Sequence, residues 1–288
     1  MRRDPSSEML GAGSVAARLH RLFAADGRCF DVAVDHGFFG EPRFLSGIED
    51  LDAALDVLIE AAPDAIQLSP GSARLLQRRA GPKPALVMRT DVADVYGPAV
   101  DRKRRYFSEL LPEAVDQALR LDAACVVVNL LWIEGQAHLH RECLRNIATL
   151  KARCEPSGMP LMVEPLAMKA GAAGYGVDGD AERIRTIVRQ GVELGADIIK
   201  GDPTDDLGDY PSVIEVAGGV PVLVRGGGRA SDEEVMHRTE AVMKAGAAGI
   251  VYGRNVIQHE RPREMTRALM AIVHDGASAD AALAMTRG

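Results

Sequence analysis

The sequence predicts a single-domain (β/α)8 TIM barrel, an α/β fold in which eight parallel strands alternate with helices. Short apolar runs rich in β-branched residues alternate with amphipathic helical stretches along the whole chain, which is the order expected of a parallel sheet. The repeat is about 31 residues long, close to one βα unit. A chain of 288 residues is long enough for one such barrel.

Eight segments have the character of strands that are buried on both faces, because each is a continuous apolar run that ends in a polar or charged residue. In chain order they are residues 30–35, 65–69, 85–91, 124–130, 161–165, 197–201, 221–226 and 248–253. We expect Pro165 to end regular pairing of the fifth strand, because proline has no N–H to donate. The polar strand ends should share one rim, where barrels of this kind place their active sites.

The stretches between the strands carry helix signals. Apolar residues recur at helical spacing in residues 51–59 and 139–154. Ser231 followed by Glu234 predicts a helix start, and Gly195 predicts a helix end. These helices should cover the outside of the barrel.

The barrel is predicted to cover most of the chain. Residues 1–27 are expected to be a helical extension, with a helix from Val15 to Ala25 that closes the lower end of the barrel. Residues 28–276 form the barrel, and residues 277–288 form a short final helix. No stretch is long enough to act as a linker between domains.

The formal net charge is −7 and the sequence pI is near 5.6, which argues against sequence-independent binding of nucleic acid. The basic run at residues 102–105 is the exception. It is interpreted as a solvated loop or helix start, with a local phosphate or partner patch as the alternative.

The four cysteines form no C-x-x-C pair, so neither a zinc site nor a disulfide framework is indicated. The first residues have no signal-peptide pattern, and no apolar run approaches 18 residues. We therefore expect a cytoplasmic protein with no membrane partner.

Lys200 is the strongest candidate for a catalytic residue. It is the one lysine of six that ends an apolar strand, whereas the others lie in loops or on polar helix faces. Burial disfavours the charged ammonium, so a lysine in such surroundings can act as a neutral amine and form a Schiff base with a carbonyl. The alternative is a structural ion pair with Asp35, Asp202 or Glu164.

Two carboxylates are predicted at the same rim. Asp35 ends the first strand in the triplet DHG and is a candidate to exchange protons beside a Schiff base, with a helix cap as the alternative. The neighbouring His36 is a candidate substrate contact. Glu164 ends the fifth strand and is a candidate either for acid and base chemistry or for an ion pair with Lys200.

Glycine-rich segments with arginines follow the seventh and eighth strands. Glycines let the backbone approach an anion, and barrels commonly hold a phosphate at these two loops. The sequence therefore predicts a phosphate site there, made by Arg225, Gly226, Gly227, Gly228, Gly253 and Arg254. Arg89, like Arg225, is interpreted either as an anion contact or as a group that neutralises the acidic rim.

Four segments resemble the DeoC/LacD and DhnA-type class I aldolases. They are VAVDHG (32–37), ADIIK (196–200), PVLVRGGG (221–228) and the long run at 247–276. The similarity covers about residues 28 to 276 and is strongest in the last third. This group includes archaeal-type fructose-bisphosphate aldolase, 2-amino-3,7-dideoxyheptulosonate synthase and an autoinducer-processing thiolase.

The resemblance implies roles that agree with the positions at the strand ends. It implies that Lys200 forms the Schiff base, that Asp35 is catalytic, and that the glycines and Arg254 bind phosphate. It also implies a homo-oligomer. One position departs from the archaeal fructose-bisphosphate aldolases and heptulosonate synthases, which carry a tyrosine acid/base just past the fifth strand, where this chain has Leu166.

The Glu164-Pro165 pair is similar instead to the tagatose-bisphosphate and sulfofructose-phosphate aldolase branch. That similarity implies that Glu164 transfers protons or orients the lysine. Arg225 stands where a serine is usual in the family, which implies contact with a second anionic group.

We therefore predict a class I aldolase, a carbon–carbon lyase that acts reversibly on a phosphorylated ketose or a related anionic ketone without a metal or organic cofactor. The alternatives are a lysine-dependent transfer or thiolysis enzyme, a barrel isomerase that uses Asp35 and Glu164, and a non-catalytic sugar-phosphate-binding barrel. Several loop aspartates have no fixed metal-ligand spacing and are interpreted as ordinary loop groups. They are Asp178, Asp180, Asp202, Asp205 and Asp206.

Overall fold

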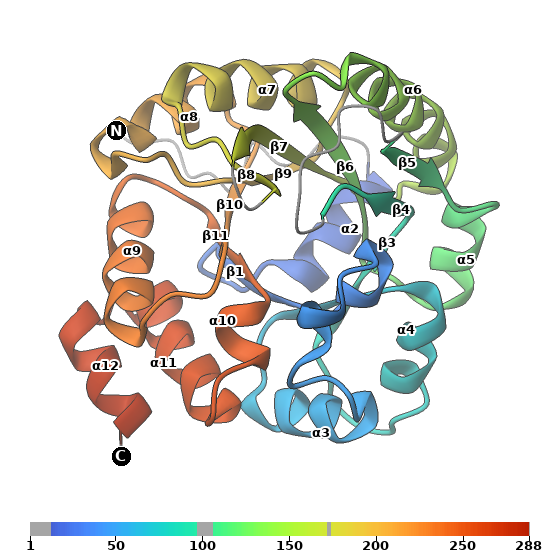
Figure 1. Ribbon diagram of the computed structural model, residues 1–288. Coiled ribbons are helices and arrows are strands. Elements are labelled where there is room, and N and C mark those ends of the chain that lie inside the picture. Colours follow the sequence, from blue (N-terminus) through green and yellow to red (C-terminus); the bar gives the residue numbers. More distant parts are fainter. Residues whose placement is uncertain (1–12, 97–105, 172–173, 288) are drawn as a thin grey trace.

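Eight parallel strands close into a barrel in the computed structural model, which describes residues 13–96, 106–171 and 174–287 (Figure 1). They are β1 (Cys29–Ala33), β2 (Ala65–Leu68), β3 (Ala85–Arg89), β6 (Cys125–Ile133), β7 (Leu161–Gly171), β9 (Ile198–Gly201), β10 (Val222–Arg225) and β11 (Gly249–Tyr252). Neighbours pair in this order, and β11 returns to β1. The predicted single-domain (β/α)8 TIM barrel is confirmed, and each predicted segment overlaps one of these strands.

Helices surround the barrel (Figure 1). They are α2 (Gly13–Leu22), α3 (Leu51–Ala61), α4 (Pro70–Gln77), α5 (Ala114–Arg120), α6 (Ala137–Cys154), α7 (Ala181–Glu193), α8 (Tyr210–Val216), α9 (Asp232–Lys244), α10 (Arg254–Ile257), α11 (Pro262–Asp275) and α12 (Ala279–Arg287). None of the described helices is both long enough and apolar enough to cross a membrane.

The helix signals in the sequence are confirmed. The predicted apolar face of α6 is buried, and so are Leu55 and Leu58 of α3. At the start of α9 the side chain of Ser231 accepts a hydrogen bond from the backbone N–H of Glu234. Gly195 follows α7 with a φ of +90°, a conformation that favours glycine.

The barrel interior is filled by small and branched side chains from all eight strands. Cys29, Ala65, Val87, Cys125, Val127, Met162, Ile198, Leu223 and Val251 are among them. Leu19, Leu22 and Phe23 at the end of α2 pack into the same cluster. The helix, expected from Val15 to Ala25 and observed over Gly13–Leu22, therefore packs at the amino-terminal end of the barrel, and the site lies at the opposite end.

Two additions to the simple barrel were not predicted. β4 (Asp91–Asp94) and β5 (Phe107–Leu110) form an antiparallel pair after β3, and β8 (Gly174–Val177) pairs antiparallel with the end of β7. The basic run at 102–105 lies outside the described residues.

The expectation that Pro165 ends regular pairing is wrong. β7 runs through Pro165 and stays paired with β6 as far as Met168. Its pairing with β9 ends at Val163, so Pro165 lies where that side of the strand has become an edge. A proline is tolerated on an edge because no neighbouring strand there needs a hydrogen bond from its backbone nitrogen. The fifth barrel strand is therefore longer than predicted.

We expect Leu22→Ala to lower the free energy of unfolding by about 2–5 kcal/mol, because it leaves a cavity beneath the barrel. The Leu22 side chain is only 1% exposed. The matched control is Leu119→Ala in α5, where the residue is 37% exposed and the loss should stay below about 1 kcal/mol. Urea unfolding followed by circular dichroism measures both, and equal losses would show that α2 does not close the barrel.

Candidate active site

A small pocket opens at the carboxyl ends of the barrel strands. Its lining contains every predicted site residue except Gly228. The lining residues are Ala33, Asp35, His36, Phe39, Phe44, Arg89, Tyr96, Glu164, Lys200, Arg225, Gly226, Gly227, Val251, Gly253 and Arg254. The strand-end positions found in the sequence thus come together around one cavity.

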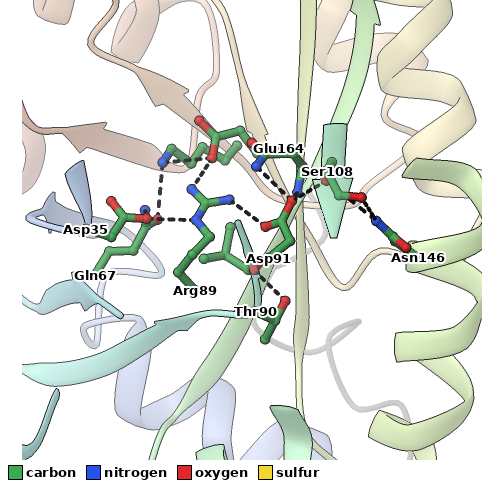
Figure 2. Close-up of polar contacts among 11 residues, drawn as sticks. Asp35, Gln67, Arg89, Thr90, Asp91, Ser108, Asn146 and Glu164 are labelled. Atoms are coloured by element: carbon green, nitrogen blue, oxygen red, sulfur yellow. Dashed lines mark hydrogen bonds and ion pairs between the residues drawn. The ribbon is translucent and has the colours of Figure 1, made fainter. Parts of the chain in front are cut away.

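Arg89 lies at the centre of the polar contacts, and its side chain is fully buried (Figure 2). Its Nε donates to Asp35 Oδ2 at 2.7 Å, and its Nη2 donates to Glu164 Oε2 at 2.5 Å. Its Nη1 is 3.4 Å from Asp91 Oδ1. The guanidinium is thus occupied by carboxylates, which favours neutralisation of the acidic rim over direct contact with an anion.

Lys200 is the penultimate residue of β9 and is only 3% exposed. Its Nζ is 3.1 Å from Glu164 Oε2 and donates at 3.1 Å to Gln67 Oε1. The expectation of apolar surroundings holds for the strand but is wrong for the amine, which has a carboxylate and an amide as partners. The structural ion pair with Glu164 is present, and Lys200 also faces the pocket.

Asp35 and Glu164 have the same arrangement of contacts. In each, one oxygen accepts both donors, from Gln67 and Arg89 for Asp35 and from Arg89 and Lys200 for Glu164. The other oxygen has no hydrogen bond within the described ranges. Asp35 makes no helix-capping hydrogen bond, so its alternative role as a cap is not observed.

Both carboxyl groups are held ionised by their cationic neighbours. Burial opposes ionisation, yet Arg89 and Lys200 outweigh it and hold the pKa of Asp35 below its usual value. The same two cations, with Arg225, lower the pKa of Glu164 despite its burial. Near neutral pH both groups therefore accept protons and have none to give.

His36 lies beside Asp35 and is neutral near neutral pH. Burial lowers its pKa to about 4, despite the opposing effect of Asp35. Its ring packs closely against Gly253, where an added Cβ would lie 2.4 Å from the His36 Cε1 atom. Only glycine fits at this position without moving the imidazole.

The loop after β10 is held in place by residues of α10. Asn255 Nδ2 donates to the carbonyl oxygens of Gly226 and Gly228 at 2.9 and 3.2 Å, and Arg254 Nη2 donates to that of Gly227 at 2.9 Å. The two glycine segments predicted to hold a phosphate are therefore in direct contact. Gly228 belongs to this loop but does not line the pocket.

Arg225 reaches the same side of the pocket from the end of β10. Its Nε donates to Asp202 Oδ1 at 2.5 Å, while its Nη2 is buried with no hydrogen-bond partner in the described part of the chain. A free guanidinium N–H at the pocket wall can donate to an anionic ligand.

An aromatic wall on the pocket was not predicted. It consists of Phe39 and Phe44, which follow β1, and Tyr96, which follows β4. The Tyr96 ring makes edge contacts with both, at centroid distances of 5.6 Å and 5.0 Å. Arg254 lies 4.5 Å from the centroid of Phe44. These residues lie outside the strand ends, so no sequence signal at the rim points to them.

Gln67 and Asp31 were also missed, although each is a polar residue inside an apolar strand segment. Gln67 of β2 bridges Asp35 and Lys200. Asp31 is fully buried within β1, neither of its carboxylate oxygens has a partner within the described residues, and burial raises its pKa to about 7. A polar side chain interrupting an apolar run is the signal that was available.

The described residues contain no cluster of three or more histidine, cysteine, aspartate or glutamate side chains placed to hold a metal ion. Asp178 instead pairs with Lys169 and Arg183, and Asp180 caps α7. The interpretation of these aspartates as loop groups agrees with these contacts.

Comparisons with known proteins find an aldolase family. A family model described as DeoC/LacD family aldolase matches residues 29–259. The 2-amino-3,7-dideoxy-D-threo-hept-6-ulosonate synthase of Halobacterium salinarum is 32% identical over 277 residues, 96% of this chain and 97% of that protein. An uncharacterized aldolase of Saccharolobus solfataricus is 29% identical over 270 residues, which cover 92% of this chain and 96% of that protein.

A solved structure of a Schiff-base-forming fructose-1,6-bisphosphate aldolase is also similar. It aligns with a TM-score of 0.75 and 25% identity, over 90% of this chain and 100% of that one.

We expect Arg89→Met to lower the free energy of unfolding by about 3–5 kcal/mol at pH 7, because it leaves three buried carboxylates without their shared cation. The loss should shrink toward pH 4, where these carboxylates can take up protons. Arg21→Met is the control, since the Arg21 side chain is 42% exposed in its pair with Asp122 and should cost less than about 1 kcal/mol. Urea midpoints at both pH values measure this, and a loss at pH 7 no larger than the control's would contradict it.

Asp31 should make the protein less stable as the pH rises. The folded carboxyl keeps its proton up to a pH of about 7, whereas the unfolded one loses it near 3.8. The free energy of unfolding therefore falls between these values. We expect Asp31→Asn to be more stable than the wild type by roughly 2–4 kcal/mol at pH 8 and similar to it at pH 4.

Urea unfolding of the wild type and Asp31→Asn across this range tests the expectation. The control is Asp116→Asn on the exposed surface of α5, for which we expect no such trend. A stability difference for Asp31→Asn that does not change with pH would rule out the proposed ionisation.

Proposed function

This chain belongs to the DeoC/LacD family of aldolases. We propose that it uses Lys200 to form a Schiff base with a phosphorylated or otherwise anionic ketone. The enzyme is a carbon–carbon lyase of the aldolase type, as predicted. The observation that carries the proposal is the position of Lys200, which lies near the carboxyl end of a barrel strand, lines the pocket and contacts Glu164.

Lys200 first gives a proton to a neighbouring carboxylate, and its amine then attacks the ketone carbon to form a carbinolamine. The carboxylate returns that proton to the hydroxyl of the carbinolamine, which leaves as water and gives an iminium. The iminium carries the same positive charge as the resting ammonium, so Glu164 neutralises both without moving. The iminium draws electrons from the adjacent carbon–carbon bond, which lowers the barrier to cleavage.

Asp35 and Glu164 are suited to accept protons in this cycle. Each has one oxygen held by two donors and one without a hydrogen bond among the described residues. The held oxygen fixes the position of the group, and the other can take a proton from the substrate. Gln67 holds the side chains of Asp35 and Lys200 in fixed positions by hydrogen bonding to both.

A phosphate group of the substrate is proposed to bind at Gly226, Gly227, Gly253 and Arg254. Support comes from the absence of side chains at the glycines, the position of Arg254 at the pocket and the common use of these loops for phosphate in barrels. The N–H of Arg225 without a partner adds a donor for an anionic substrate. A cytoplasmic location and a homo-oligomer remain predictions.

A second candidate function is aldol transfer rather than simple cleavage. The 32% identity with a heptulosonate synthase favours it, because that relative is named as a synthase. Product analysis with several acceptors separates the two, since transfer requires an acceptor for turnover and cleavage does not.

Borohydride reduction with dihydroxyacetone phosphate tests the Schiff base. We expect the mass of the reduced donor on the peptide that contains Lys200, at lower donor concentration than for dihydroxyacetone without phosphate. Lys200→Met should give no adduct. Lys244→Met, whose side chain is 74% exposed, should behave as the wild type. Absence of the adduct from the wild type with both donors would overturn the proposal, and equal dependence on the two donors would overturn the phosphate site.

A further inference from the structure

Formation of a carbon–carbon bond by an enamine requires a proton donor. As the enamine carbon attacks an aldehyde, the electron pair of the C=O bond moves to the aldehyde oxygen. A group at the pocket wall must then protonate that oxygen, and in the cleavage direction the same group must take the proton back.

Most ionisable groups in the described lining hold no proton to donate in the resting enzyme. Asp35 and Glu164 have lowered pKa values and rest as carboxylates, and His36, with a pKa of about 4, rests as a neutral ring. Guanidinium groups do not release protons in proteins. Lys200 is consumed in the iminium.

Tyr96 is the remaining group, and it has the only side-chain hydroxyl among the described lining residues. It comes from the segment after β4, and edge contacts with Phe39 and Phe44 hold its ring at the wall. No hydrogen bond of its hydroxyl to another described residue is present, and the residue lines the pocket.

The charges around Tyr96 suit a phenol that loses and regains a proton. Burial raises its pKa, so the resting phenol is protonated. The positive charges of Arg225 and Arg254 lower the pKa of Tyr96, whereas the negative charges of Glu164 and Asp202 raise it. A transient phenolate is therefore formed beside two guanidinium groups, which stabilise its negative charge.

We propose that Tyr96 is the general acid and base of the carbon–carbon bond step. In condensation the new C–C bond forms, the phenol gives its proton to the aldehyde oxygen, and the enamine becomes an iminium. Water then adds to the iminium carbon and releases the amine of Lys200, and the proton set free returns to the phenolate. Cleavage runs the same steps backward. The inference rests on the Schiff-base function proposed above.

Tyr96→Phe is the test, because it removes the hydroxyl and keeps the ring that packs on Phe39 and Phe44. Donor binding is read from the borohydride adduct with dihydroxyacetone phosphate. The bond-forming step is read from product formation with glycolaldehyde, D-glyceraldehyde and D-glyceraldehyde 3-phosphate. We expect an unchanged adduct on Lys200, a KM for the donor within about threefold of wild type, and a fall in kcat of about 100-fold or more.

Tyr175→Phe is the matched control, since the Tyr175 hydroxyl donates to the backbone carbonyl of Glu134 and its residue does not line the pocket. It should keep wild-type kcat. A kcat for Tyr96→Phe within threefold of wild type would overturn the inference. An equal loss of adduct and product in this variant would also overturn it, because the hydroxyl would then act in donor binding. Failure of the Schiff base itself shows in a different result, the lack of an adduct in the wild type.

Discussion

The pairing of the buried guanidinium of Arg89 with Asp35, Asp91 and Glu164 is the interaction on which the site depends. A lone buried cation is strongly unfavourable, and so is a group of buried carboxylates, but each compensates the other here. The three carboxylates follow or belong to β1, β4 and β7, so one side chain ties together segments that lie far apart in the sequence. Asp91 in turn accepts from Ser108 of β5 (Figure 2) and from Asn129 of β6, which anchors the β4–β5 pair to the barrel.

These contacts also set which groups of the pocket can accept protons and which can bind negative charge. Because Arg89 and Lys200 keep Asp35 and Glu164 ionised, the side of the pocket around Lys200 offers proton acceptors and a counter-ion for a cationic intermediate. The pocket lining also contains two arginines, glycine backbone and a phenol, which suit an anionic ligand and a developing negative charge. Substrate orientation across the pocket would follow from this separation of charge.

The positions at the strand ends were predictable because strand character and its polar end are local features of the sequence. Lys200, Asp35, Glu164, Arg225 and the glycine loops were found in this way, and all but Gly228 line the pocket. The expectation for Pro165 was wrong because the effect of a proline depends on which neighbouring strand is paired at that residue, and the pairing of β7 with β9 ends at Val163. Tyr96, Phe39 and Phe44 escaped notice because loops bring them to the pocket from outside the repeat.

The sequence by itself determined the barrel, the order of its strands and the set of side chains at its open rim, since each follows from short-range hydrophobic pattern and from chain connectivity. Only the tertiary structure decided which of these side chains meet and in what state of ionisation. Arg89 became a counter-ion rather than an anion contact, and Lys200 gained Glu164 and Gln67 as partners. Such pairings depend on distances across the barrel and on burial, and neither can be read from spacing along a strand.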